Sequence, residues 1–234
     1  MTGMESSSDI EPVGNWTWEA MTPEDQAVLR PHMTRCHLPQ GDVLMQADDP
    51  VDRVYFPVTA DIANVVRLSD GSAGMATTVG RDGLTGLAAF LAKEPLGWDV
   101  QVQIGGYGWS LPADVLRRQF EVSPALADLM LTVTHKNQVE AARNAVCNLR
   151  HQVTQRLARW LLQTQDRTGL SEFLMTQDEM ATLLGVRRTT MVMSCRELVA
   201  SGAIFNRRGR IRVLSRKILK SQSCDCYGAP AQRP

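Results

Sequence analysis

The spacing of hydrophobic residues changes from a strand-like to a helical pattern near residue 112. Before that point, from about residue 35, short runs rich in β-branched and aromatic residues alternate with Gly and Asp turns. The runs read VLMQA, RVYFPV, IANVVRL, GMATTV, WDVQVQI and YGWSL. Regularly spaced short runs of this kind predict a small antiparallel β-barrel or sandwich. A helix over residues 21–30 is predicted before them, because Thr22 can cap it and Pro23 suits its first position.

A long helix is predicted from Pro124 to Arg150. After its first residue it contains no Gly or Pro, and it is rich in strong helix formers. An apolar stripe runs along it, and a helix of this length outside a large core is typical of a contact between two subunits. The alternative is a helix that lies on the β-domain of its own chain. The predicted dimer contacts are Leu126, Met130, Val133, Asn137, Ala141 and Ala145.

Residues 176–213 contain two short helical patterns followed by an Arg-rich strand, turn and strand. Thr176 and Glu179 have the spacing of a capping box at the start of the first helix. Gly185 permits a tight turn before the second helix, which opens with the sequence Arg187-Arg188-Thr189-Thr190. Polar side chains crowded at a helix N-terminus suit contacts with phosphates and base edges. The layout is that of a winged helix-turn-helix and predicts DNA binding.

The distribution of charge supports this prediction, although the net charge of the chain is +0. Residues 1–142 hold 9 basic and 19 acidic side chains, a net of −10, whereas residues 143–234 hold 16 and 6, a net of +10. An acidic half joined to a basic half indicates two domains, the basic one suited to a polyanion. No apolar run approaches the ~20 residues that span a bilayer. We therefore expect a cytoplasmic protein that does not bind membranes.

A Gly-rich segment, GRDGLTGL at residues 80–87, interrupts the strand pattern. A turn of this kind that leads into a short helix can receive an anion on its backbone N–H groups. The alternative, an ordinary turn, is favoured because isolated glycine motifs are weak signals. The candidates for effector contacts are Arg81, Gly83, Thr85 and Gly86.

The chain has five cysteines, an odd number, and it is expected to be cytoplasmic, so a disulfide framework is not expected. The cysteines also lack any CxxC pairing. Cys195 is spaced with Met191 and Leu198 on one helix face, which favours a buried small hydrophobe over a redox switch. Cys224 and Cys226 offer too few ligands for a closed zinc site, so no metal site is predicted. No Ser/His/Asp set or P-loop points to an enzyme.

Several of these stretches together resemble the Crp/Fnr superfamily of bacterial transcription regulators. They are RLARWLL at residues 156–162, the capped helix at 176–185, Gly202-Ala203-Ile204 and the Arg-Gly-Arg wing tip. The resemblance covers roughly residues 21–227. It implies an α+β fold with an antiparallel, jelly-roll-like β-roll of the cyclic-nucleotide-binding type, a long dimerisation helix and a winged helix-turn-helix. It also implies a homodimer on palindromic DNA, with RNA polymerase as a further partner.

The resemblance sets the expected domain boundaries. They are a flexible tail over 1–20, the β-roll over 21–122, the dimerisation helix over 123–151, the winged helix over 152–228 and a second flexible tail over 229–234.

Two departures from the family pattern concern ligands. Members that bind cyclic AMP carry a Gly-Glu pair and an arginine that holds the phosphate, whereas this region reads Thr85-Gly86-Leu87 and lacks the arginine. Asp99 nearby would repel an anion. Cyclic AMP is therefore not expected as the ligand, and neither is an iron–sulfur cluster, since Cys36 has few other cysteines near it. The β-roll then serves an unknown ligand or, alternatively, is only a scaffold or a surface for a protein partner.

The resemblance also implies roles in DNA reading. Arg188 stands in the place of the base-reading arginine, suited to guanine. Thr189 replaces a glutamate, so the operator should differ from the familiar palindromes at that step. Thr176 and Gln177 match phosphate-contacting places. The remaining predicted DNA contacts are Arg187, Thr190 and Arg196 on the second helix and Arg207, Arg208 and Arg210 on the wing.

Overall fold

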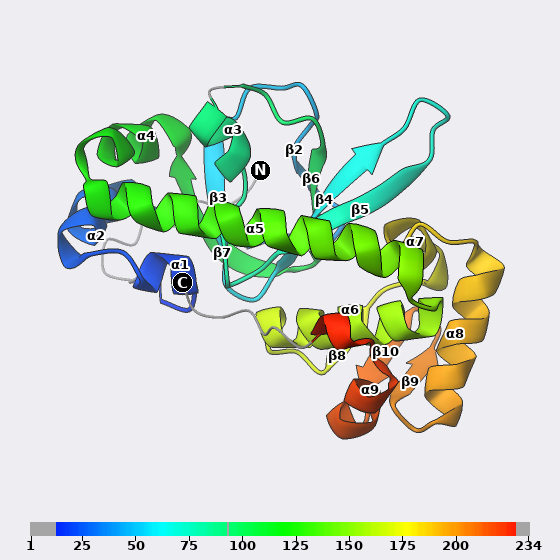
Figure 1. Cartoon of the computed structure of the whole chain (residues 1–234). Helices are drawn as coiled ribbons and strands as arrows, with labels where there is room; N and C mark the ends of the chain where they lie inside the picture. The colour runs from blue at the N-terminus through cyan, green and yellow to red at the C-terminus, as the bar shows by residue number, and fades with distance from the viewer. Residues whose placement is uncertain (1–12, 93, 228–234) are drawn as a thin grey trace.

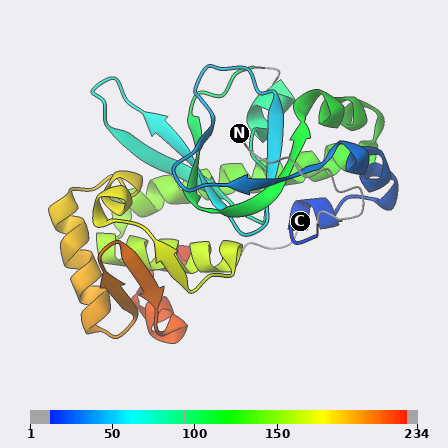
Figure 2. The same cartoon turned by 180° about the vertical axis from the view of Figure 1, so that it is seen from behind.

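The computed structural model describes residues 13–92 and 94–227 (Figure 1). A β-roll forms one part of the molecule and a small helical domain with its own sheet forms the other. The long helix α5 (Pro124–Arg150) runs beside both of them. Figure 2 shows the same molecule from behind, where the strands of the roll lie in front of this helix.

Two antiparallel sheets build the roll, as the alternating runs predict. One sheet has the order β1 (Thr34–Leu38), β7 (Gly106–Pro112), β3 (Arg53–Pro57). The other has the order β2 (Val43–Met45), β6 (Asp99–Ile104), β4 (Asp61–Arg67), β5 (Ala73–Val79). Side chains such as Val54, Phe56 and Ile62 are buried between the sheets and the covering helices.

Short helices close the ends of the roll. They are α1 (Trp16–Glu19), α2 (Pro23–Leu29), the 3-10 turn η1 (Arg30–His32), α3 (Leu87–Ala92) and α4 (Ala113–Val122). Thr22 caps α2 by accepting from the Asp25 N–H, as predicted.

The predicted tail over residues 1–20 is wrong for its last part. Asn15 is buried and its side-chain amide donates to the carbonyls of Pro57 and Gly83, each at 2.8 Å. Trp18 is buried beside Phe56. The segment after residue 13 is therefore part of the roll. The tails predicted at residues 1–12 and 229–234 lie outside the described residues.

Helix α5 has the predicted bounds, but its apolar stripe faces its own chain. Leu126, Met130 and Val133 are buried in one hydrophobic cluster with residues of the roll such as Phe90. These three were predicted as dimer contacts, and this burial corrects the prediction, because their surface is already covered within one chain. The exposed apolar residues of the same helix include Leu131, Val139, Val146 and Leu149, the last with 84% of its surface exposed.

The C-terminal domain is the predicted winged helix-turn-helix. Its helices are α6 (Val153–Thr168), α7 (Gln177–Leu183), α8 (Arg188–Ala200), α9 (Arg216–Gln222) and the 3-10 turn η2 (Asp225–Tyr227). Its sheet has the order β8 (Glu172–Leu174), β10 (Arg210–Val213), β9 (Ile204–Arg207). Strand β8 was not predicted, because three residues carry too little pattern to distinguish a strand from a loop.

Local chemistry accounts for the shape of this domain. Thr176 and Glu179 form the predicted capping box. At the wing tip Arg208 and Gly209 both have positive φ, 52° and 73°, which is the two-residue turn that matches the twist of a hairpin. Cys195 is buried with Met191 and Leu198, which confirms the inward face predicted for α8.

Candidate DNA interface, effector cavity and domain junction

The exposed face of α8 carries the polar residues predicted to read DNA. Met191, Cys195 and Leu198 turn one face of the helix toward the core. The opposite face and the N-terminus of the helix remain in solvent. The predicted contacts there, all of them exposed, are Arg187, Arg188, Thr189, Thr190 and Arg196.

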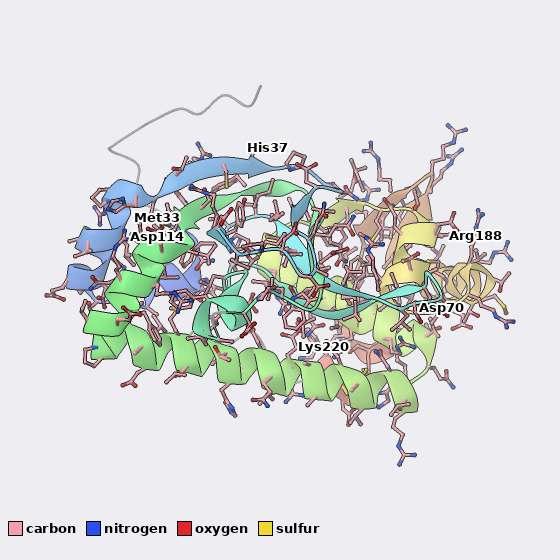
Figure 3. The ribbon with its side chains drawn as sticks, turned by 90° about the horizontal axis from the view of Figure 1, so that it is seen from above. Met33, His37, Asp70, Asp114, Arg188 and Lys220 are labelled. Atoms are coloured by element: carbon pink, nitrogen blue, oxygen red, sulfur yellow. The ribbon has the colours of Figure 1, made fainter. Side chains whose placement is uncertain are left out.

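Arg188 lies at one end of the molecule, far from Met33 and Asp114 at the other end (Figure 3). Its Nε is 3.1 Å from the Asp178 Oδ1 of α7, and the two side chains are 69% and 60% exposed. An ion pair this exposed contributes at most about 1 kcal/mol. Asp178 therefore orients Arg188 without preventing it from turning to another acceptor.

The wing brings a second set of cations to the N-terminus of α7. The Met175 N–H donates to the Gly209 carbonyl at 2.7 Å, so the wing tip lies beside Thr176. Thr176 is exposed and Gln177 is half-buried. Arg207, Arg208 and Arg210 are exposed along the wing, and Arg210 pairs with Glu172 at 2.7 Å. The predicted phosphate contacts of the first helix and of the wing thus lie close together.

A cavity of about 340 Å³ lies between the roll and α5. Thr85 and Gly86, two of the four predicted effector contacts, line it together with Trp98, Asn137 and Ala141. None of the described residues that line it has a charged side chain. The cavity therefore offers hydrogen bonds and apolar contact, but no cation for a phosphate.

The other two predicted effector contacts, Arg81 and Gly83, are not among the residues that line this cavity. Arg81 instead donates to the carbonyls of Arg167 at 2.7 Å and Val58 at 3.1 Å. It therefore helps to hold α6 against the roll.

Asp99 also has a different role from the one expected. It does not line the cavity but accepts from the Ala47 N–H at 2.9 Å and pairs with Arg67 at 2.5 Å. These two partners, the backbone N–H first, hold the pKa of Asp99 below its usual range. The uncharged lining of the cavity therefore disfavours an anionic ligand, whereas Asp99 does not face it.

A buried guanidinium joins the DNA-binding domain to the rest of the chain. Arg167 of α6 is 4% exposed. It pairs with Asp82 of the roll at 3.1 Å and with Glu140 of α5 at 2.9 Å. Its stem packs on Gly80, where a Cβ would lie 2.5 Å from the Arg167 Cβ. This junction was not predicted, because its members come from three separate stretches of the sequence.

Asp61 lies behind the same guanidinium. It accepts from the Thr164 hydroxyl at 3.0 Å, and its Oδ1 has no partner among the described residues. Burial raises the pKa of Asp61 to about 7, although Arg167 and Thr164 oppose the rise. Burial alone would lower the pKa of Arg167, but the carboxylates of Asp82, Glu140 and Asp61 raise it.

A cluster of sulfur and nitrogen atoms at the end of α5 was also not predicted from the sequence. Cys147 and His151 meet Cys224 and Cys226, and one ligand atom from each lies within 4.8 Å of the others. The expectation that Cys224 and Cys226 lack further ligands is therefore wrong. The spacing of four residues between Cys147 and His151 could have indicated this cluster, since it places both residues on one helix face.

Comparison with known proteins agrees with both halves of the fold. Residues 35–123 match the cyclic nucleotide-binding domain and residues 155–221 match the Crp-like helix-turn-helix domain. A CRP-like cAMP-activated global transcriptional regulator of Mycobacterium tuberculosis is 24% identical over 213 residues, which are 88% of this chain and 92% of that protein.

Solved structures show the same fold. A putative transcriptional regulator of the Crp/Fnr family from Eubacterium rectale is 14% identical with a TM-score of 0.66, covering 88% of this chain and 96% of that one. FixK2 from Bradyrhizobium japonicum is 16% identical with a TM-score of 0.65, covering 82% and 98%.

No helix among residues 13–92 and 94–227 is long and apolar enough to cross a membrane.

The two matched domains span about two thirds of the chain, in the order and positions of the observed roll and winged helix. This protein therefore belongs to the Crp/Fnr family and is a DNA-binding transcription regulator, not an enzyme.

Proposed function

We propose that this regulator binds a palindromic operator as a homodimer, with α8 of each subunit in a major groove. The observation that carries the proposal is the exposed N-terminus of α8, where the side chains of Arg187 and Arg188 lie in solvent. Half-sites would lie about one helical turn apart, as two-fold symmetric helix-turn-helix dimers require. A protein that reads chromosomal DNA acts in the cytoplasm, where RNA polymerase is its expected partner.

Arg188 is the residue proposed to read a base. Its guanidinium can donate two hydrogen bonds to O6 and N7 of one guanine. Asp178, its present partner, is itself acidic and would be repelled by the DNA backbone. Thr189 offers a hydroxyl and a methyl group in place of a carboxylate, so an operator with a preference for cytosine at the facing position is not expected.

The proposed dimer seam is the solvent face of α5. Its members are all exposed and follow one another at intervals of four and three residues, the spacing of a coiled-coil seam. They are Leu131, His135, Gln138, Ala142, Ala145 and Leu149. Ala145 was among the contacts predicted from sequence. Asn137 and Ala141, also predicted, line the effector cavity behind the seam.

Gln138 belongs to both surfaces, because it is exposed on the seam and also lines the cavity. A ligand in the cavity could therefore act directly on the contact between subunits. Between the end of α5 at Arg150 and the start of α6 at Val153 only two residues intervene. This short hinge is the proposed route from the seam to the DNA-binding domain, as a two-state rearrangement biased by the ligand.

The chemistry of the cavity favours an uncharged or mostly apolar small molecule. A cyclic AMP phosphate would enter it without a counter-charge, which is costly in a site of low polarity. The M. tuberculosis relative is named as cAMP-activated, but we propose that this chain responds to a different signal. A second candidate is a regulator that binds no ligand and uses the roll as a scaffold or as a surface for a protein partner. The uncharged lining of the cavity supports this candidate as well.

Three experiments test this proposal. Sedimentation of the protein on a selected DNA duplex should give two chains per duplex, and a complex of one chain would exclude the proposed dimer. Titration calorimetry with cyclic AMP should give no binding at micromolar concentrations. A thermal-shift screen with uncharged metabolites then separates the two candidates, since a true ligand raises stability by RT ln(1 + [L]/Kd).

A further inference from the structure

Four metal-ligating side chains converge where the long helix ends. Cys147 lies in the last turns of α5 and His151 is its C-cap residue. Cys224 and Cys226 come from the segment after α9, which folds back against α6 as η2 (Figure 1). The Sγ atoms of Cys147 and Cys224 are 3.6 Å apart, and the Cys226 Sγ is 3.6 Å from the His151 Nδ1.

These separations match the edges of a tetrahedral coordination shell. Zinc binds thiolate sulfur at about 2.3 Å and imidazole nitrogen at about 2.0–2.1 Å. A regular tetrahedron with those bond lengths places two sulfurs about 3.8 Å apart and a sulfur and a nitrogen about 3.6 Å apart. All four ligand atoms lie within 4.8 Å of one another, so a single ion fits among them and a multi-iron cluster does not.

The orientation of His151 is a second, independent indication. Its Nδ1 faces Cys226, while its Nε2 is 3.4 Å from the Asp225 Oδ1. A metal-bound histidine commonly donates its other ring N–H to a carboxylate, which fixes the ring and the tautomer. Here Asp225 can hold the proton on Nε2, which leaves the lone pair of Nδ1 free to bind a metal.

The burial of the cysteines and the charge around them also fit a zinc site. Cys147 and Cys224 are buried, which suits a closed site without a water ligand. Three thiolates, a neutral imidazole and Zn²⁺ carry a net charge of −1. Arg159 is buried, its Nε and Nη1 have no partner among the described residues, and its positive charge acts on Cys147 and Cys226. It is placed to balance the charge of the occupied site.

We propose that Cys147, His151, Cys224 and Cys226 bind one zinc ion in a closed structural site. The three thiols release three protons to solvent when the ion binds, and no group is oxidised or reduced. The ion fastens the segment after α9 to the end of α5, two residues before α6 begins. Tyr227 continues the same attachment, because its hydroxyl donates to Asp166 of α6 at 2.7 Å. The metal therefore holds the hinge between the long helix and the DNA-binding domain.

A disulfide between Cys147 and Cys224 is the competing use of the same atoms. It would leave Cys226 and His151 without a role and would need an oxidant. The arrangement of His151 toward Asp225 is explained by the metal and not by the disulfide.

The test uses the full chain without a polyhistidine tag, purified under reducing conditions and analysed for metals. One zinc per chain is expected after removal of loosely bound metal by gel filtration. Exchange of the zinc for Co²⁺ should give the intense thiolate-to-cobalt absorption and the visible bands of a four-coordinate ion. Cys226→Ser and His151→Asn should each lower the zinc content well below one per chain. Cys36→Ser, in strand β1 of the roll, is the matched control and should retain one zinc.

Several results would overturn the proposal. The first is that the wild-type protein neither contains zinc nor takes up zinc or Co²⁺. The second is that it contains iron and sulfide in place of zinc. The third is a Cys147–Cys224 disulfide in non-reduced peptides. Full zinc content in both Cys226→Ser and His151→Asn would do the same. Cys224→Ser is avoided because that side chain is buried, so failure to fold would be confused with loss of metal. Hydrogen exchange adds a readout in the wild type, since chelation should raise exchange reversibly at the end of α5.

Discussion

Arg167 of α6 holds Asp82 of the roll through both carboxylate oxygens, with its Nε 3.1 Å from each. The same guanidinium reaches Glu140 of α5 at 2.9 Å and donates to the Thr78 hydroxyl. One buried side chain thus joins the roll, the long helix and the DNA-binding domain. This contact therefore fastens α6 to both the roll and α5.

Arg167→Met should destabilise the protein by about 3–5 kcal/mol, because it leaves buried carboxylates without a cation. Urea unfolding followed by tryptophan fluorescence measures the change. Arg118→Met is the control, since Arg118 pairs with Asp114 in solvent and an exposed pair contributes about 0–1 kcal/mol. Equal losses in the two variants would contradict the role of Arg167.

Gly80→Ala should also disturb this junction, because the new methyl group would lie 2.5 Å from the Arg167 Cβ. Overpacking of this kind costs about 1–3 kcal/mol. Gly74→Ala is the matched control, since it lies in strand β5, which ends just before Gly80, and has nothing within 4 Å of the added atom. In thermal unfolding, the midpoint of Gly80→Ala should be lower than that of Gly74→Ala. A Gly80→Ala protein as stable as Gly74→Ala would show that the packing against Arg167 is loose.

Asp61 should make stability depend on pH between about 4 and 7. Its pKa in the folded protein is raised from the ordinary 3.8 to about 7, so the folded state binds the proton more tightly. Its contribution is fully present below pH 4 and is lost as the pH rises to 7, by at most ~4 kcal/mol at 1.36 kcal/mol per pKa unit. The groups that act on it are Arg167, Thr164, Asp82 and Glu140.

Asp61→Asn should therefore flatten the plot of unfolding free energy against pH over this range. Chemical unfolding at several pH values provides the measurement. The control is Asp128→Asn, a change at an exposed carboxylate. A wild-type stability that does not fall between pH 4 and 7 relative to Asp61→Asn would show that Asp61 titrates normally.

The proposed seam predicts the effect of charge on the oligomeric state. Ala142→Glu with Leu149→Lys should convert a dimer into the 25.9 kDa monomer, because both changes place like charges face to face across a two-fold axis. Sedimentation equilibrium measures the mass. Leu68→Lys, at another exposed leucine, should leave the dimer intact. Dissociation by Leu68→Lys alone, or a dimer that survives the double change, would place the interface elsewhere.

The sequence predicted the features that depend on neighbouring residues. The Thr176–Glu179 capping box and the inward face of α8 are of this kind, since each is determined by residues a few positions apart in the sequence. The stripe of α5 was also visible, but periodicity does not say which surface covers it. Met130 was therefore predicted in the dimer seam and lies instead against the roll.

Contacts between distant stretches could not be predicted. Arg167 and Asp82 are 85 residues apart, and Cys147 and Cys224 are 77 residues apart. Only the packing of α6 against the roll and of the final segment against α5 brings these pairs together. The cavity between the roll and α5 has the same origin, because Thr85 and Asn137 line it from different elements.

The central claim, that the N-terminus of α8 reads base sequence, is tested by selecting bound sequences from random DNA. The wild type should select a palindrome with half-sites about one helical turn apart. Arg188→Ala should lose its preference at one base pair of each half-site, at a cost of about 1–3 kcal/mol, and keep its preference elsewhere. A uniform loss of affinity across all sequences, or no sequence preference in the wild type, would contradict the account.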